Sequence, residues 1–223
     1  MTLPADPSAP PIRLVSAQID ESAVVRSHPT GSELPLVLLL HGLGSHERDL
    51  TGFVPHLPNR FQYASLRGIH AWVQGYAWLE AQIDPAAPEA LERSAAAVEA
   101  WIAGRAAEGV RTRGAIGFSQ GGMLALQLLR RRPEALDWIV QLSGAPFPAP
   151  MPGDAALAAR RPPALWGHGG LDPLFDAARE QEVRTFMTAH TDLVEERSPY
   201  LGHGVDEQVL AAVRRFLDAA PER

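Results

Sequence analysis

The order of apolar and polar positions predicts strands that alternate with helices along most of the chain. Residues 36–40, L-V-L-L-L, are apolar at every position, which is typical of a strand buried on both faces of a parallel sheet. Residues 89–108 instead carry apolar side chains at helical spacing. Further strands are predicted at residues 12–19, 23–26, 61–66, 115–118, 138–142, 164–167 and 193–196, and further helices at residues 47–56, 120–132, 176–189 and 205–219.

This alternation predicts an α/β fold with a mostly parallel central sheet and helices on both faces. Residues 67–88 and 146–163 are rich in glycine, proline and aromatic residues without a period, so we expect long irregular loops there. Both segments follow strands and should gather at the carboxyl edge of the sheet, where open α/β sheets bind ligands. We expect one domain over residues 12–223, after a flexible lead-in at residues 1–11.

The composition of the chain argues against nucleic acid as a partner and against chemistry that needs cysteine. The formal net charge is −6 and all 20 cationic residues are arginines, without the clustered positive charge that nucleic-acid binding requires. The run Arg130-Arg131-Arg132 is explained more simply as the last turn of a helix that Pro133 stops. The absence of cysteine excludes disulfides, thiolate metal sites and cysteine nucleophiles.

The sequence shows no sign of export or membrane insertion. Residues 1–11 lack the apolar core of a signal peptide, and no run reaches the roughly 20 apolar residues needed to cross a bilayer. We therefore expect a soluble, cytoplasmic protein that acts on a small molecule, with its oligomeric state left open.

The segment Gly117-Phe118-Ser119-Gln120-Gly121 has the G-x-S-x-G pattern of a nucleophile elbow. It follows a predicted strand and opens a predicted helix, which is the context this turn requires. A serine on so sharp a turn has a strained backbone, and the flanking glycines let neighbouring segments approach closely. The alternative, a glycine-rich helix start capped by a serine, fits this context less well.

A serine nucleophile needs a histidine base that is itself held by an acid, in the chain order Ser, acid, His. Three histidines follow Ser119: His168, His190 and His203. His203 is flanked by glycines on the last loop, so its ring can reach the serine, and we favour it as the base. His168, at the end of a strand, is the alternative, whereas His190 fits a surface position at a helix end.

Asp172 is the predicted acid, because it lies on the loop after the preceding strand. Asp176 lies too far into a helix start, and Asp154 lies in the second irregular loop. Asp206 and Glu207 are explained more simply as first-turn acids favoured by the helix dipole.

The oxyanion of a tetrahedral intermediate needs two hydrogen-bond donors. We expect them to be the main-chain N–H groups of Gln120 and of Leu43, in the glycine loop H-G-L-G that follows the all-apolar strand. His41, in the same loop, fits a structural hydrogen-bonding role better than a catalytic one. A metal site built from His41, His168, His203 and Asp172 lacks ligands at helical i, i+4 spacing, so no metal or other cofactor is expected.

Aromatic residues on or beside the carboxyl-edge loops are candidates for an acyl pocket. We predict that Trp78, Phe147 and Phe175 line it. Trp166 lies within a strand and fits the core equally well.

Six segments, in order, resemble the phospholipase/carboxylesterase family, which includes acyl-protein thioesterases and small bacterial carboxylesterases. They are L-H-G-L-G-S-H-E-R-D-L (40–50), G-Y-A-W (75–78), G-F-S-Q-G-G (117–122), L-S-G (142–144), and G-H-G-G-L-D-P-L-F (167–175) with G-H-G (202–204). The resemblance extends over nearly the whole chain beyond the first dozen residues. It implies an α/β-hydrolase fold with no separate lid domain, a triad of Ser119, Asp172 and His203, oxyanion donors at Leu43 and Gln120, and no cofactor.

We therefore predict a serine carboxylesterase or thioesterase that hydrolyses short- to medium-chain acyl esters through an acyl-enzyme intermediate. A dienelactone-hydrolase-like or peptidase-like hydrolase would share the elbow and the triad order, although the former usually has cysteine as its nucleophile. A non-catalytic small-molecule-binding protein would need the pocket, but not the triad and both glycine loops together. Their joint presence favours catalysis.

Overall fold

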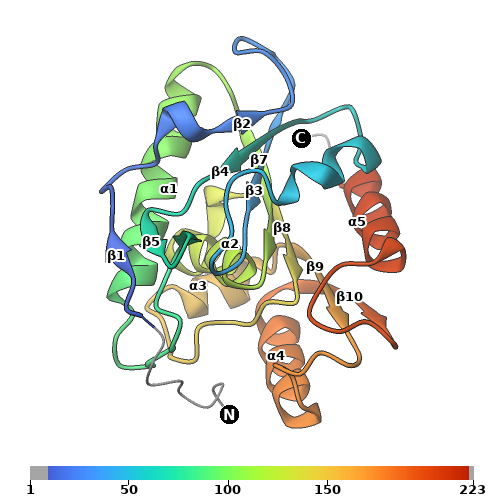
Figure 1. The fold of residues 1–223 in the computed structure, drawn as a ribbon. Coiled ribbons are helices and arrows are strands. Elements are labelled where there is room, and N and C mark those ends of the chain that lie inside the picture. Colours follow the sequence, from blue (N-terminus) through green and yellow to red (C-terminus); the bar gives the residue numbers. More distant parts are fainter. Residues whose placement is uncertain (1–9, 221–223) are drawn as a thin grey trace.

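The computed structural model describes residues 10–220, which surround a seven-stranded sheet (Figure 1). At one edge, β2 (Val25–Arg26) pairs antiparallel with β4 (Gln62–Leu66), and all the other neighbours in the sheet are parallel. From β4 the strand order continues through β3 (Leu36–Leu40), β7 (Thr112–Phe118), β8 (Trp138–Leu142), β9 (Pro163–Gly169) and β10 (Asp192–Ser198).

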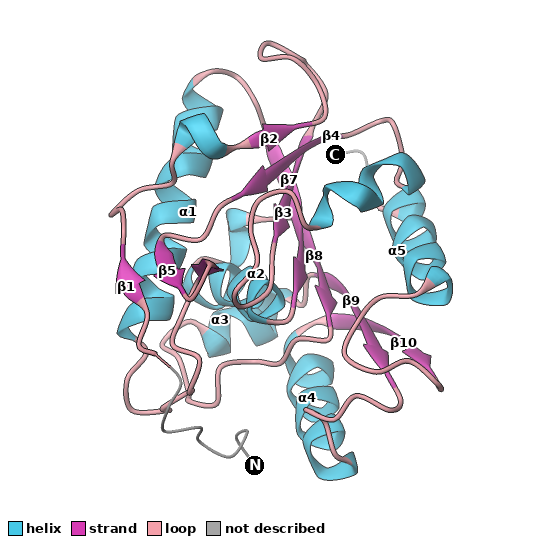
Figure 2. Ribbon diagram, in the orientation of Figure 1, coloured by secondary structure: helices cyan, strands magenta, loops and turns pink. Residues whose placement is uncertain are grey.

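Helices cover both faces of the sheet, as predicted (Figure 2). One face packs against α1 to α4, and the other packs against α5 and the 3-10 helix η2. Figure 1 shows α1 and α5 on opposite sides of the strands. The helices are α1 (Glu89–Ala107), α2 (Gln120–Arg131), α3 (Asp154–Arg160), α4 (Ala177–His190), α5 (Glu207–Ala219) and η2 (Leu50–His56), with a further 3-10 turn η3 (Pro133–Ala135).

The apolar run at β3 explains why the sheet is covered twice. Leu36, Leu38 and Leu40 belong to the core shared with α1 and α2. Val37 and Leu39 point the other way, into the core shared with α5. All five side chains are buried, so the predicted strand with two buried faces is confirmed.

The segment at residues 67–88, predicted to be irregular, contains two short strands. β5 (His70–Trp72) and β6 (Gly75–Ala77) form a hairpin, and β1 (Arg13–Leu14) joins β5 to complete a separate three-stranded sheet. Three-residue strands are too short to show an alternating pattern, so periodicity could not predict them.

Other boundaries also differ from the predictions. The strand expected at residues 12–19 shrinks to β1, and the one at residues 23–26 to β2, preceded by the 3-10 turn η1 (Glu21–Ala23). The second predicted loop contains α3, in which Leu157 is the buried residue. Of the predicted lead-in, residues 1–9 lie outside the described part of the chain.

The path of the chain across the sheet changes direction at β3. It runs from β3 to β4 on one side, and later from β7 to β8 on the other, so the loops after β3 and β7 diverge. Such a switch point leaves a crevice at the carboxyl ends of the strands, where open α/β sheets bind ligands. His41 directly follows β3 and Ser119 directly follows β7.

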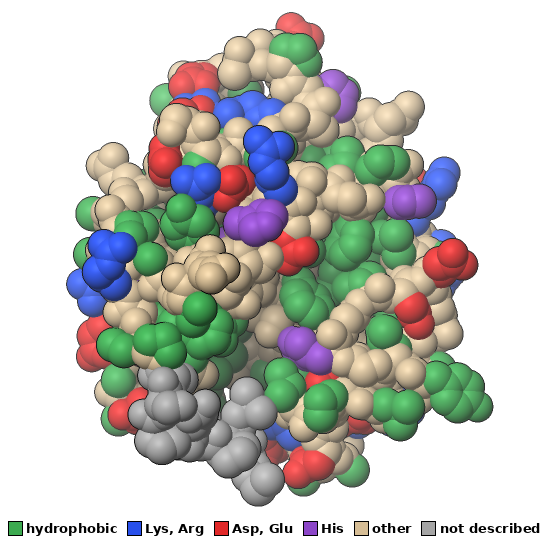
Figure 3. Space-filling view, viewed as in Figure 1, with side chains coloured by type: hydrophobic (Ala, Val, Ile, Leu, Met, Phe, Trp, Pro, Cys, Tyr) green, Lys and Arg blue, Asp and Glu red, His purple; other side chains and the backbone are tan. Residues whose placement is uncertain are grey.

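Hydrophobic side chains gather in the middle of the face shown in Figure 3, flanked by histidine and acidic side chains. Within residues 10–220, no helix combines the length and the apolar character needed to span a membrane.

Candidate active site

Ser119 stands on a strained turn between β7 and α2. Its φ of 52° lies in the left-handed region that favours glycine, and its ψ is −114°. Its N–H donates to the carbonyl of Leu142 over 2.8 Å, and its carbonyl accepts from the N–H of Met123 over 3.1 Å. These two hydrogen bonds fix the serine between the end of β8 and the first turn of α2.

The glycines of the elbow are required by close main-chain packing. A Cβ on Gly117 would lie 2.1 Å from the carbonyl oxygen of Gly121. One on Gly121 would lie 2.0 Å from the carbonyl oxygen of Leu40, at the end of β3. The reason predicted for these glycines, close approach of neighbouring segments, therefore matches the geometry.

Replacing Gly121 by alanine is expected to lower the free energy of unfolding by about 3 kcal/mol or more, because the atoms it meets are main-chain atoms that cannot move aside. The matched control is Gly104→Ala inside α1, where a Cβ meets nothing within 4 Å. There alanine should stabilise the helix by up to about 1 kcal/mol. Urea unfolding measures both changes, and a Gly121→Ala variant as stable as the wild type would contradict this packing.

A buried carboxylate holds the imidazole of His203. The Nδ1 atom of His203 lies 2.7 Å from Oδ2 of Asp172. With Nδ1–H donating to this carboxyl oxygen, Nε2 is the acceptor of the ring. The side chain of Asp172 has no exposed surface, and its other oxygen accepts the N–H of Leu174 over 2.9 Å. The ring of His203 also contacts that of Phe118, with the centroids 5.0 Å apart.

Ser119 and His203 line the same pocket, a cavity of about 480 Å³ at the carboxyl edge of the sheet. The described contacts include no hydrogen bond between Ser119 Oγ and the imidazole of His203. Catalytic hydrogen bonds of this kind often tighten only when substrate binds. The structure thus brings together the predicted nucleophile and the His203–Asp172 pair around one cavity.

The other two histidines of the C-terminal half have different partners. His168 is fully buried, stacks on Trp166 with ring centroids 3.8 Å apart, and has its Nε2 atom 3.0 Å from Glu195. His190 bonds a carbonyl of the preceding helical turn over 2.8 Å. Neither is among the described residues that line the pocket.

Main-chain hydrogen bonds fasten the loop after β3 to β6. The N–H of Gly44 donates to the carbonyl of Tyr76, and the N–H of Tyr76 donates to the carbonyl of Ser45, both over 2.8 Å. A Cβ on Gly75 would lie 2.0 Å from the carbonyl oxygen of Gly44, so this close approach requires glycine. The hairpin that periodicity missed is therefore the support of this loop.

Leu43 and Gln120, the predicted oxyanion donors, both line the pocket. Within the described residues, neither N–H group donates to another main-chain oxygen. Sequence patterns do not reveal the role of the Gln120 side chain, which accepts the N–H of Trp78 and donates to the carbonyl of Leu79, each over 3.1 Å. It ties the loop after β6 to the elbow.

His41 is a structural residue of the loop, in agreement with the role expected for it. Its Nε2 atom accepts the N–H of Gly68 over 3.0 Å, and its Nδ1–H donates to the carbonyl of Gly42 over 2.7 Å. Burial lowers the pKa of His41 to about 4. The ring is therefore neutral near pH 7.

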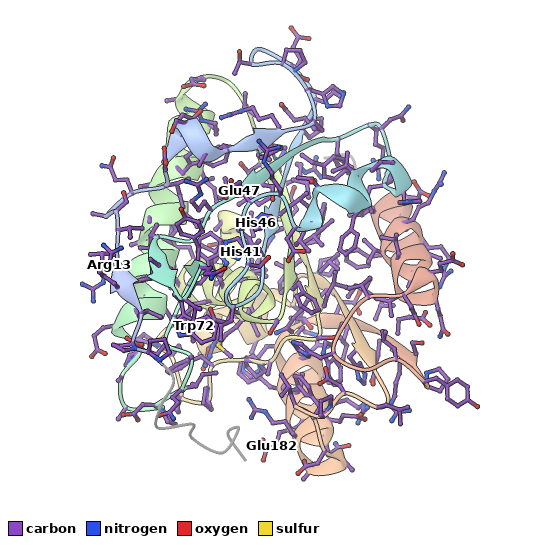
Figure 4. The ribbon with its side chains drawn as sticks, in the orientation of Figure 1. Arg13, His41, His46, Glu47, Trp72 and Glu182 are labelled. Atoms are coloured by element: carbon purple, nitrogen blue, oxygen red, sulfur yellow. The ribbon has the colours of Figure 1, made fainter. Side chains whose placement is uncertain are left out.

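Glu47 and Arg67 hold the far end of the same loop, and Figure 4 shows Glu47 beside His46 and His41. Two nitrogens of the Arg67 guanidinium donate to the two oxygens of Glu47, each over 2.7 Å. The guanidinium also lies 4.7 Å from the centre of the Tyr76 ring. Hydrogen bonding from Arg67 lowers the pKa of Glu47 from 4.5 to about 2, although burial acts in the opposite direction.

This pKa predicts a pH-dependent contribution to stability. A carboxylate whose pKa is lower in the folded than in the unfolded chain stabilises the fold above pH 4.5, and the effect is lost as the pH falls through about 2. Glu47→Gln is therefore expected to unfold more easily at pH 7, by up to about 3 kcal/mol. In urea titrations at pH 3, the loss in free energy of unfolding should be about half of the loss at pH 7. A loss that does not change with pH would contradict the lowered pKa of Glu47.

The aromatic residues predicted to line the pocket do not all reach it. Phe175 lines the cavity. Trp78 instead is fully buried, with its Nε1–H donating to the carbonyl of His41 over 2.9 Å, and Phe147 is packed in the core beside α2. Trp166 is also in the core. The apolar lining comes instead from Leu43, Ala81, Ile83, Pro85, Met123, Ala145, Pro148 and Leu174.

The physical reason is the direction of the side chains. A place on a carboxyl-edge loop brings a residue near the pocket, but the side chains of Trp78 and Phe147 pack into the core with residues of α1 and α2.

The mostly parallel sheet, the switch point at β3 and a strained serine between β7 and α2 define an α/β-hydrolase-type fold. The sequence matches the Phospholipase/Carboxylesterase family over residues 21–220, and the chain belongs to that family of carboxylesterase- and thioesterase-like hydrolases. No curated protein matches the sequence.

Solved esterase structures share the fold. Esterase PE8 is 25% identical with a TM-score of 0.71, over 96% of this chain and 99% of its own. The Bacillus cereus carboxylesterase is 20% identical with a TM-score of 0.73, over 88% of this chain and 93% of its own. Zea mays acyl-protein thioesterase 2 is 20% identical with a TM-score of 0.70, over 88% of this chain and 98% of its own. The last two similarities show a common fold alone.

Proposed function

We propose that this chain is a serine esterase that hydrolyses short- to medium-chain acyl esters or thioesters through an acyl-enzyme. The observation that carries the proposal is the strained Ser119 in one pocket with His203, whose ring is bonded to the buried Asp172. Serine at its ordinary pKa is a weak nucleophile, so this pairing gives it the base that it needs.

In the proposed first step, Ser119 Oγ bonds to the acyl carbon while its proton passes to Nε2 of His203. Asp172, hydrogen-bonded to Nδ1, stabilises the imidazolium. The N–H groups of Leu43 and Gln120 donate to the oxygen that becomes negative. When the tetrahedral intermediate collapses, the proton on Nε2 goes to the leaving alkoxide or thiolate, and Ser119 keeps the acyl group.

In the second step, water loses a proton to Nε2 of His203 and its oxygen attacks the acyl carbon. The same two donors stabilise the second oxyanion, and the proton returns to Ser119 Oγ as the acid leaves. No metal or other cofactor takes part in this scheme.

The pocket supports the proposed substrate class. Apolar side chains such as Ile83, Met123 and Phe175 line a cavity of about 480 Å³, which lies in the range of small-molecule sites. A short or medium acyl chain can be buried there. Each added methylene that is buried contributes about 0.8 kcal/mol, or about fourfold in kcat/KM.

The experiment is hydrolysis of 4-nitrophenyl acetate, butyrate, hexanoate, octanoate and decanoate, with a hexanoyl thioester in parallel. We expect turnover that rises from acetate to hexanoate and then levels off as the pocket fills. A folded preparation that releases 4-nitrophenolate no faster than buffer does contradicts the proposal.

A further inference from the structure

Two charged side chains from α4 reach the pocket that Ser119 and His203 line. Arg179 and Glu182 both line it, and the Nη1 atom of Arg179 donates to Glu182 over 2.9 Å. Their side chains differ in exposure, at 20% for Arg179 and 63% for Glu182. Figure 4 labels Glu182 at the lower end of the view, beside α4. The Arg179 side chain is thus the less exposed of the two.

Arg179 uses few of its hydrogen-bond donors within the protein. Its guanidinium, which has five N–H groups, makes one hydrogen bond to the described residues, that to Glu182. Arg105 is equally exposed, at 20%, yet it bonds Glu21 and Glu108 and packs over the ring of Trp101. The unused donors of Arg179, on a side chain that lines the pocket, offer hydrogen bonds to an acceptor carried by a ligand there.

We propose that Arg179 binds a carboxylate carried by the substrate, and that Glu182 occupies this guanidinium until the substrate replaces it. The inference rests on the proposed esterase function and names its substrate class: esters with an apolar chain that bears one carboxylate. The planar guanidinium matches a carboxylate with two parallel hydrogen bonds. A doubly charged phosphate fits less well, because Glu182 stands beside the same guanidinium.

The test compares mono-4-nitrophenyl adipate and suberate with 4-nitrophenyl hexanoate and octanoate, so that each pair differs in one terminal carboxylate. The quantity measured is the ratio of kcat/KM for the charged ester to that for the neutral ester. Arg179→Gln is expected to lower this ratio by about ten- to hundredfold, the effect of losing a hydrogen bond to a charged group. Glu182→Gln, an exposed substitution, is expected to raise the ratio severalfold.

The matched control is Arg184→Gln, which removes the same charge from the same helix. Arg184 is bonded to Glu195 and is not among the described pocket residues, so the ratio should stay within about twofold of the wild-type value.

Acetoxybenzoate, compared with its methyl ester, tests a carboxylate on the alcohol side of the ester. A drop in either charged-to-neutral ratio with Arg179→Gln supports the proposal.

The outcomes separate this inference from the function it rests on. Turnover of the neutral esters, with ratios that neither Arg179→Gln nor Glu182→Gln changes, overturns the role of Arg179 and leaves the esterase intact. Absence of turnover of every ester overturns the esterase and this inference with it. Should Arg179→Gln fail to fold, the ratio in Glu182→Gln decides: an increase supports the proposal and an unchanged value contradicts it.

Discussion

Replacing Ser119 by alanine is expected to lower kcat for 4-nitrophenyl hexanoate by at least about 10⁴-fold, because the atom proposed to bond the acyl carbon is removed. The fold should be retained. Alanine at a φ of 52° is strained much as serine is, so the free energy of unfolding should stay within about 0.5 kcal/mol of the wild-type value. Steady-state kinetics and urea unfolding of the same preparation measure both.

The control for Ser119→Ala is Ser143→Ala, since Ser143 also lines the pocket and also has a left-handed φ, of 47°. Its hydroxyl donates to the carbonyl of Gly204 over 3.3 Å. We expect Ser143→Ala to keep activity within about tenfold of the wild type. Loss of activity in Ser143→Ala, with activity retained in Ser119→Ala, would reassign the nucleophile.

The second large effect is expected for His203→Ala, which should also lose at least about 10⁴-fold in kcat. Without the imidazole, the proton of Ser119 has no acceptor and the leaving group has no donor. His168→Ala provides the comparison, because both changes remove a histidine from the carboxyl-edge region of the sheet. His168→Ala should keep most of the activity but lose about 1 to 3 kcal/mol of stability, through its contacts with Trp166 and Glu195.

Kinetics of the two histidine variants, with thermal unfolding of each, decide between the two assignments. If His168→Ala is inactive while folded and His203→Ala is active, the base has been assigned to the wrong loop.

The fold was predictable wherever burial is regular. β3 alternates between two cores, so all of its positions must be apolar, and this pattern alone identifies a central strand. α2 and β8 were likewise predicted to within a residue. Tertiary contacts, by contrast, define the hairpin of β5 and β6: the bonds of Tyr76 to the loop after β3 hold it, and no local periodicity encodes them.

In the candidate site, too, sequence patterns indicated some residues and missed others. Ser119, Asp172 and His203 each follow a strand of the central sheet, and the carboxyl ends of parallel strands meet at one edge, so chain order and spacing were enough to propose that they lie close together. The direction of a side chain on an irregular loop is set by packing. Trp78 and Phe147 therefore entered the core rather than the pocket, and sequence patterns did not identify Arg179 at all.

The most direct measurement of the central proposal is covalent labelling by a fluorophosphonate, which phosphonylates a serine only when its hydroxyl is activated. The intact mass of the folded protein should increase by one phosphonyl group, and peptide mapping should place that group on Ser119. Ser119→Ala, shown to be folded, should not be labelled. A wild-type protein that stays unlabelled while folded, or a Ser119→Ala variant labelled as fast as the wild type, would contradict the proposal that Ser119 is the nucleophile.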